Sequence, residues 1–152
     1  MLSKKLALAN IPQKISGKKV LIRVDFNVPL KDGKVSDSTR IKESLASIKF
    51  AKDNGAKAIT IMSHLGRPDG FKKMKFSLKP IVETFSNLLK QEVHFLDDCV
   101  GQNVQDTVAK ADGGKIILLE NLRFYAAEEG SSVDDNKVKT KEKPEVIKEF
   151  RS

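Results

Sequence analysis

The feature that most constrains this chain is the regular alternation of short apolar runs with longer amphipathic segments. Four short runs rich in Val, Ile and Leu are predicted to be strands: 20–24, 58–62, 93–96 and 116–119. Three longer segments between them carry apolar side chains at the spacing of one helix face: 37–54, 77–90 and 100–111. Strands that alternate with helices favour a parallel sheet covered on both faces, so we predict a doubly wound, Rossmann-like α/β domain.

Turn and capping residues set the expected ends of these elements. Residues 31–34 (KDGK) contain an Asp-Gly pair that is typical of a tight β-hairpin. Asp37 or Ser38 is expected to cap the first helix, and Ser77 the second, with Pro80 in its first turn. We likewise expect the Asp97-Asp98 pair to cap the third helix rather than to bind a cation.

The C-terminal part has a different composition. Residues 128–143 are rich in charged and small side chains, which predicts a long loop. Pro144 then opens a helical pattern whose apolar positions continue to the end of the sequence. Residues 1–152 are therefore expected to form an incomplete domain.

Three polar segments follow the predicted strands or overlap their ends. They are residues 23–29 (RVDFNVP), 63–68 (SHLGRP) and 120–124 (ENLRF). In an open parallel sheet the carboxyl ends of the strands lie along one edge, where ligands bind. We therefore expect the three segments to converge on one site, which their arginines would make cationic.

The charge distribution agrees with an anionic ligand. The net charge is +8, and residues 40–79 alone hold ten Lys or Arg against three Asp or Glu, a local balance of +7. Such a field concentrates anions, although Lys42, Lys49, Lys52 and the cluster Lys72, Lys73 and Lys75 are better explained as a solvated face. Only 6% of the residues are aromatic, and most belong to apolar stripes. Without aromatic side chains among the basic ones to stack on bases, we expect no nucleic-acid partner.

Two arginines occupy positions that a structural role does not explain. Arg40 falls in the first turn of a predicted helix, where a cation opposes the helix dipole by about 0.3–1 kcal/mol. An arginine beside free N–H groups is favourable if both face an anion, most simply a phosphate. Arg67 lies between Gly66 and Pro68, which permit close backbone approach and stiffen the loop.

Other polar residues of the three segments leave alternatives open. His64 either donates to a carboxylate or phosphate oxygen or is satisfied by the loop backbone. Asp25 and Asn27 offer an acceptor and an amide for a substrate hydroxyl, but Asp25 is equally placed for a salt bridge to a nearby arginine such as Arg23.

Several kinds of site are not indicated. The sequence has no G-x-x-x-x-G-K-[ST] loop and no G-x-G-x-x-G turn. Its lone cysteine, Cys99, and its two histidines, His64 and His94, are not at metal-ligand spacing, so no metal site is expected. Cys99 is expected to be a packed thiol, and a single cysteine fits a reducing compartment. No stretch is long and apolar enough to span a membrane, which predicts a cytoplasmic protein without a membrane partner.

In this order and spacing, residues 23–29, 63–68 and 118–124 resemble the N-terminal domain of phosphoglycerate kinase. Residues 97–101 (DDCVG) and 128–130 (EEG) add to the resemblance. It implies a glycolytic transferase that moves a phosphoryl group reversibly between 1,3-bisphosphoglycerate and ADP, giving 3-phosphoglycerate and ATP. It also implies that Mg-ATP or Mg-ADP is held by a C-terminal nucleotide-binding domain missing from residues 1–152, and that the complete enzyme is monomeric. The 152-residue chain alone is expected to bind no nucleotide and to be inactive.

The resemblance also implies roles for individual residues. The implied substrate-binding set is Val24, Asp25, Phe26, Asn27, Thr39, Arg40, Ser63, His64, Gly66, Arg67, Leu122 and Arg123. Within this set the resemblance implies that Arg40 is catalytic and stabilises the phosphoryl group in transit. Asp25 and Asn27 would contact the glycerate end, while His64, Arg67 and Arg123 would bind its phosphate or carboxylate. The alternative is a non-catalytic anion-binding or protein-interaction module derived from that domain.

Overall fold

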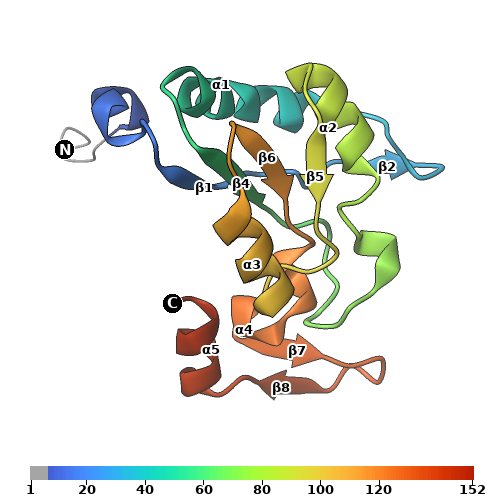
Figure 1. The fold of residues 1–152 in the computed structure, drawn as a ribbon. Helices are drawn as coiled ribbons and strands as arrows, with labels where there is room; N and C mark the ends of the chain where they lie inside the picture. The colour runs from blue at the N-terminus through green and yellow to red at the C-terminus, as the bar shows by residue number, and fades with distance from the viewer. Residues whose placement is uncertain (1–6) are drawn as a thin grey trace, which may run out of the picture.

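A four-stranded parallel sheet forms the centre of the computed structural model, which describes residues 7–152 (Figure 1). Its strand order is β1-β4-β6-β5, and every neighbouring pair is parallel. The strands are β1 (Lys19–Arg23), β4 (Ala58–Met62), β6 (Lys115–Leu118) and β5 (Val93–Phe95). The predicted parallel sheet is therefore confirmed, with each strand within one residue of its expected bounds.

Helices cover both faces of this sheet. Helices α1 (Thr39–Asp53) and α2 (Ile81–Leu89) lie on one face and α3 (Gln102–Lys110) on the other (Figure 1). The alternation of side chains along β4 shows why, because Ile59 and Ile61 belong to the core under α1 and α2 whereas Ala58 belongs to the core under α3. The doubly wound α/β class predicted from the sequence is confirmed.

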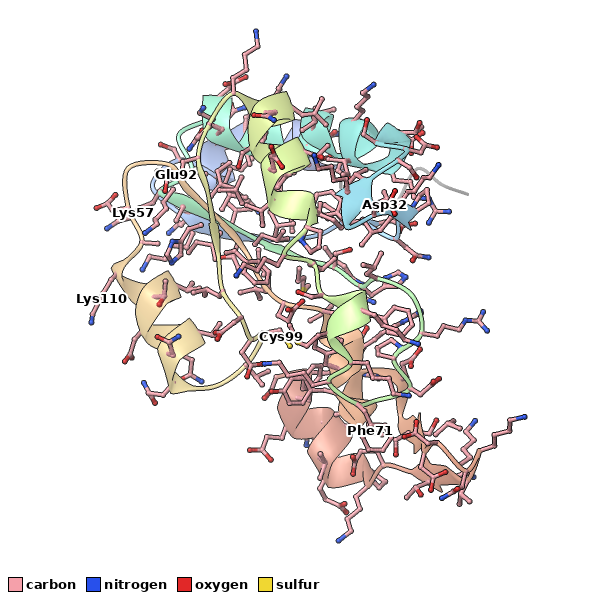
Figure 2. All side chains as sticks on the ribbon, turned by 90° about the vertical axis from the view of Figure 1, so that its right-hand side faces the viewer. Asp32, Lys57, Phe71, Glu92, Cys99 and Lys110 are labelled. Carbon is pink, nitrogen blue, oxygen red and sulfur yellow. The ribbon has the colours of Figure 1, made fainter. Side chains whose placement is uncertain are left out.

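The larger core cluster lies between the sheet and helices α1 and α2. Phe26 and Phe85 are fully buried there, and their rings meet edge to face with centroids 5.0 Å apart. Burial of one such aromatic side chain contributes about 1.5–3 kcal/mol to folding. A smaller cluster under α3 includes Val104 and Cys99. Figure 2 shows the Cys99 sulfur inside the molecule, whereas Lys57 and Lys110 lie at its periphery.

Short elements connect the layers. They are the 3-10 turns η2 (Leu8–Asn10), η3 (Pro12–Lys14), η4 (Met74–Phe76) and η5 (Leu122–Phe124), and the strands β2 (Leu30–Lys31) and β3 (Lys34–Val35). Strands β2 and β3 pair antiparallel, and Asp32 and Gly33 between them have φ values of +50° and +74°. Positive φ at both central residues is the geometry that an Asp-Gly hairpin turn requires, so the predicted hairpin is confirmed.

Capping was predicted correctly for one helix only. The Asp37 carboxylate accepts a hydrogen bond of 2.9 Å from the Thr39 backbone N–H at the start of α1. Helix α2 begins at Ile81 with Pro80 before it, so the expected Ser77 cap is wrong. The Ser77 hydroxyl accepts from the Lys79 backbone N–H at 3.1 Å and donates to the buried Glu120 carboxylate at 2.7 Å.

The expected cap of the third helix is also wrong. Helix α3 begins at Gln102, with Gly101 before it, so the aspartate pair lies outside its first turn. The Asp98 carboxylate instead accepts from the Cys99 backbone N–H at 2.7 Å and from the Tyr125 hydroxyl at 2.8 Å. The Asp98 side chain thus bonds to Tyr125, which is distant in the sequence, and does not cap the helix that follows it.

The predicted loop over residues 128–143 is the main correction to the fold. This part holds α4 (Ala126–Glu129) and the antiparallel strands β7 (Ser131–Val133) and β8 (Lys139–Lys141). The Asp134 carboxylate closes the turn between the strands by accepting from the Asn136 and Val138 backbone N–H groups at 2.9 and 2.8 Å. The expected final helix is present as α5 (Pro144–Phe150). Within the described residues, no helix has the length and apolar character needed to cross a bilayer.

Candidate functional site

The first two polar segments are joined by side-chain hydrogen bonds at the carboxyl edge of the sheet. The Ser63 hydroxyl donates to the Val24 carbonyl at 2.8 Å and accepts from the Phe26 backbone N–H at 2.9 Å. The Asn27 side-chain oxygen accepts from the Gly66 backbone N–H, also at 2.9 Å. The segments that follow β1 and β4 are therefore held in fixed register beyond the ends of their strands.

The third segment joins the same edge. The Arg123 guanidinium donates through Nη1 to the Gly66 carbonyl at 3.1 Å, and the Leu122 backbone N–H donates to the Ser63 carbonyl at 3.1 Å. The convergence expected from the strand ends is therefore confirmed. We call the surface formed by residues 23–29, 63–68 and 121–123 the strand-end edge.

Arg40 enters the strand-end edge from the first turn of α1. Its guanidinium Nη1 lies 2.8 Å from the Asp25 carboxylate. Asp25 thus forms the salt bridge left open by the sequence, but with Arg40 and not with Arg23. Burial alone would raise the pKa of Asp25, but the Asn27 backbone N–H and the Arg40 charge together lower it, so this carboxylate stays ionised at neutral pH.

Two further arginines are paired with carboxylates from α4. Arg23 Nη2 lies 2.6 Å from Glu128 Oε1, and Arg123 Nε lies 3.1 Å from Glu129 Oε1. Both glutamates belong to the short motif at 128–130 that added to the family resemblance. Their carboxylates offset part of the positive charge of the edge, which is therefore less cationic than its arginines alone would make it.

His64 lies among charges of both signs. Burial lowers the pKa of His64 below its usual value, and the Arg123 and Arg23 charges lower it further, while Asp25 and Glu129 oppose them. The imidazole is therefore neutral at pH 7, with one nitrogen that donates and one that accepts. A neutral imidazole can donate from one ring nitrogen to an anion oxygen.

The predicted substrate-binding residues differ widely in exposure. Phe26, Ser63 and Leu122 are buried, so their side chains face the protein and only their backbones lie near the edge. Thr39 is exposed and donates its hydroxyl to Asp37 at 2.6 Å. Arg67 is exposed beside Gly66. Val24, Asn27 and His64 are half-buried, and Asp25 and Arg40 are exposed.

Two residues that support the edge had no predicted role. Glu120 and Asn121 are 2% and 0% exposed, and both are polar. Their signal in the sequence was a charged side chain directly after the apolar run of β6, because such a group is buried only when it is fully hydrogen-bonded.

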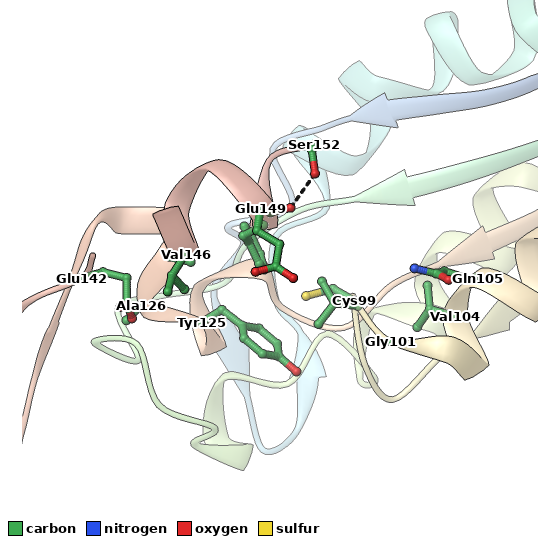
Figure 3. A pocket seen from close by; sticks show the side chains of 13 residues that line it. Cys99, Gly101, Val104, Gln105, Tyr125, Ala126, Glu142, Val146, Glu149 and Ser152 are labelled. Atoms are coloured by element: carbon green, nitrogen blue, oxygen red, sulfur yellow. Dashed lines mark hydrogen bonds between the residues drawn. The ribbon is translucent and has the colours of Figure 1, made fainter. Parts of the chain in front are cut away.

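The strand-end edge is separate from a pocket elsewhere on the molecule. A pocket of about 580 Å³ lies between α3, α4 and α5, lined in part by Cys99, Val104, Tyr125 and Val146 (Figure 3). It contains none of the predicted substrate-binding residues. Within residues 7–152, no three His, Cys, Asp or Glu side chains lie close enough together to hold a metal ion.

Comparisons with known proteins agree on one family. Residues 10–151 match the family model described as "Phosphoglycerate kinase". The phosphoglycerate kinase of Euplotes crassus is 53% identical over 152 residues, and that of Sterkiella nova is 54% identical over 151 residues. These matches cover 100% and 99% of this chain but 36% of each relative, so the chain spans about a third of their length.

Solved structures give the same result. The crystal structure of phosphoglycerate kinase from Pyrococcus horikoshii is 30% identical, with a TM-score of 0.73, over 84% of this chain and 30% of that one. The structure of phosphoglycerate kinase from Coxiella burnetii is 35% identical, with a TM-score of 0.65, over 79% of this chain and 28% of that one. Sequence, fold and the motifs at the strand ends coincide, and the chain belongs to the phosphoglycerate kinase family.

Proposed function

We propose that this chain forms the 3-phosphoglycerate-binding part of a phosphoglycerate kinase and binds that ligand at the strand-end edge. The observation that supports this most is the convergence of the three segments, which brings the guanidinium groups of Arg40 and Arg123 to one edge, the first against Asp25 and the second against the Gly66 carbonyl. A small anion with a phosphate and a carboxylate placed there would meet several guanidinium donors and a neutral imidazole. Charge-assisted hydrogen bonds of this kind are the strong ones in proteins.

The roles of the individual residues are the ones that the family resemblance implies. Asp25 and Asn27 would contact the glycerate hydroxyl, and His64, Arg67 and Arg123 would bind the phosphate or the carboxylate. Arg40, at the start of α1, would stabilise the phosphoryl group in transit together with the helix N-terminus. The accepting group is the ligand's own carboxylate, which is ionised at neutral pH, so no general base is needed. Catalysis would then consist of positioning and electrostatic stabilisation.

Kinase activity would need more than these residues. Phosphoryl transfer to or from ADP requires groups that hold Mg-nucleotide, and residues 7–152 offer no cluster suited to the metal ion. We propose that the part of the longer relatives that this chain does not span supplies the Mg-nucleotide site, and that residues 1–152 alone bind the acid but do not turn over. We further propose a cytoplasmic location and a monomeric complete enzyme, as in the family resemblance.

Calorimetry with 3-phosphoglycerate at low salt tests the binding site. Arg40→Ala, Arg67→Ala and Arg123→Ala should each weaken binding by about 1.5–3 kcal/mol, because each removes a charge-assisted contact. Lys52→Ala is the matched control, since it removes the same charge from the exposed last turn of α1. Equal affinity for sulfate and 3-phosphoglycerate, or indifference to all three arginine substitutions, would eliminate a specific site.

A further inference from the structure

Asn121 has a fully buried side chain and is not one of the predicted substrate-binding residues. Its Nδ2 donates to the Leu65 carbonyl and to the Phe76 carbonyl, both at 2.8 Å. Its Oδ1 accepts from the Arg123 backbone N–H at 3.0 Å. Both amide hydrogens and the side-chain oxygen are therefore engaged, each with a different segment of the chain.

Two of the three partners, Leu65 and Arg123, belong to the strand-end edge, and the third, Phe76, packs against it. Leu65 lies between His64 and Gly66, and the backbone amide of Arg123 fixes where that guanidinium starts. The Phe76 ring lies behind Gly66, where a Cβ atom would come within 2.4 Å of the ring. A single side-chain amide therefore sets the spacing between the loop that carries His64 and the residue that carries Arg123.

The backbone of Asn121 is fixed as well. The Glu120 carboxylate accepts from the Asn121 backbone N–H at 2.8 Å, from the Leu78 backbone N–H at 2.8 Å and from the Ser77 hydroxyl at 2.7 Å. This anchors Asn121 to the segment before α2 as well as to β6. Fully satisfied buried polar networks of this type hold their members in one arrangement.

We propose that Asn121 is a positioning residue for the anion site, holding the loop 63–68 and Arg123 in the arrangement that receives the ligand without touching it. The identity of the ligand rests on the proposed function, whereas the positioning of the loop and of Arg123 by Asn121 is independent of it. Groups that act on charge must be held to within a fraction of an ångström by supporting hydrogen bonds, and Asn121 makes such bonds to both sides of the site.

The main variant is Asn121→Ser, which adds no charge. Its hydroxyl can still accept from the Arg123 N–H, but it lacks the second donor and the reach to both carbonyls. We expect its affinity for 3-phosphoglycerate to fall about tenfold or more. In the ligand-free chain, the pKa of His64 measured by NMR should rise toward its usual value, because the loop loosens and Arg123 moves away. Asn121→Ala should do the same.

Ser77→Ala is the matched control. It removes the hydrogen bond to Glu120 and the one from the Lys79 backbone N–H, but none of the contacts of Asn121. It should lower the melting temperature and leave the pKa of His64 and the affinity unchanged. If Asn121→Ser lowers only the melting temperature, as Ser77→Ala does, its role is structural and the proposal is wrong. If the pKa of His64 rises but the wild type binds no 3-phosphoglycerate, the positioning holds and the proposed ligand fails.

Hydrogen exchange of the wild type decides the case in which neither Asn121 variant folds. The Asn121 side-chain amide and the Arg123 backbone N–H should exchange as slowly as the amides of β4. Exchange at the rate of an exposed loop would show that these bonds do not hold the edge, and would overturn the proposal.

Discussion

The strand-end edge and the C-terminal segment 126–150 are neighbours that are held by different kinds of contact. Buried side chains such as Ser63 and Asn121 hydrogen-bond the edge to its supports. In the C-terminal segment only Ala127 is buried, and every residue of β8 is exposed. That segment is held to the rest of the chain by the packing of the Tyr125 and Phe150 rings, 5.5 Å apart, by a hydrogen bond from the Val133 backbone N–H to the Asp69 carbonyl, and by the ion pairs of Glu128 and Glu129.

The two regions therefore contribute different things to the site: one fixes its geometry and the other adjusts its charge. The edge owes its geometry to buried hydrogen bonds, whereas α4 contributes the Glu128 and Glu129 carboxylates that pair with its arginines. Regions with few buried contacts open at lower free energy than the core. We therefore expect local opening of the C-terminal segment while the edge stays formed.

The largest contrast should come from a core side chain beneath the edge and an exposed one in the C-terminal segment. Phe26→Ala, beneath the edge, should lower the free energy of unfolding by about 3–5 kcal/mol, because it empties a fully buried aromatic site. Val146→Ala in α5 should lower the free energy of unfolding by less than about 1 kcal/mol, because this side chain is already 39% exposed. Urea unfolding of both variants measures this. Equal losses would show that the two regions unfold as one tightly packed unit.

A pair of serine substitutions sharpens the comparison. Ser63→Ala should lower the free energy of unfolding by about 1–3 kcal/mol, since it leaves the buried Phe26 N–H without its acceptor. Ser132→Ala in β7 should stay within about 0.5 kcal/mol of wild type. Urea unfolding of both variants measures this difference. A large loss at Ser132 would place buried polar contacts in the C-terminal segment as well.

Acid should weaken the edge through His64. The pKa of His64 is lowered in the folded chain from its usual value of 6.5, so near that pH the unfolded chain binds more protons. The stability this provides is fully present above pH 6.5 and is lost as the pH falls through the folded pKa. The melting temperature should therefore fall between pH 7.5 and 5.5, and less so in His64→Gln. An equal fall in the variant would assign the effect to other groups.

The smallest expected effect is local opening near α5. Burial raises the pKa of the Cys99 thiol to about 12, so it should react slowly with a maleimide at pH 7.5. Phe150→Ala should speed labelling severalfold while changing global stability by less than about 1 kcal/mol, because it removes one wall of the pocket beside Cys99. Labelling that tracks only global unfolding would contradict separate opening of this region.

The prediction from sequence was best where a pattern was strong and local. The strand at 58–62 was predicted to the residue because its apolar run is long and bounded by turn residues. The hairpin of β7 and β8 was missed because Ser131, Thr140 and their polar neighbours give no apolar alternation. A single carboxylate, Asp134, closes that turn, and no periodicity reveals it.

The sequence by itself determined the order of strands and helices, and therefore that the three polar segments meet at one edge. That follows from chain connectivity, since a residue after a parallel strand is delivered to the carboxyl edge whatever its partners are. Only the tertiary structure decided the partners: Arg40 for Asp25, Glu128 for Arg23, and Asn121 between Leu65 and Phe76. Hydrogen bonds and ion pairs depend on atomic separations of about 3 Å, which packing sets and residue spacing does not.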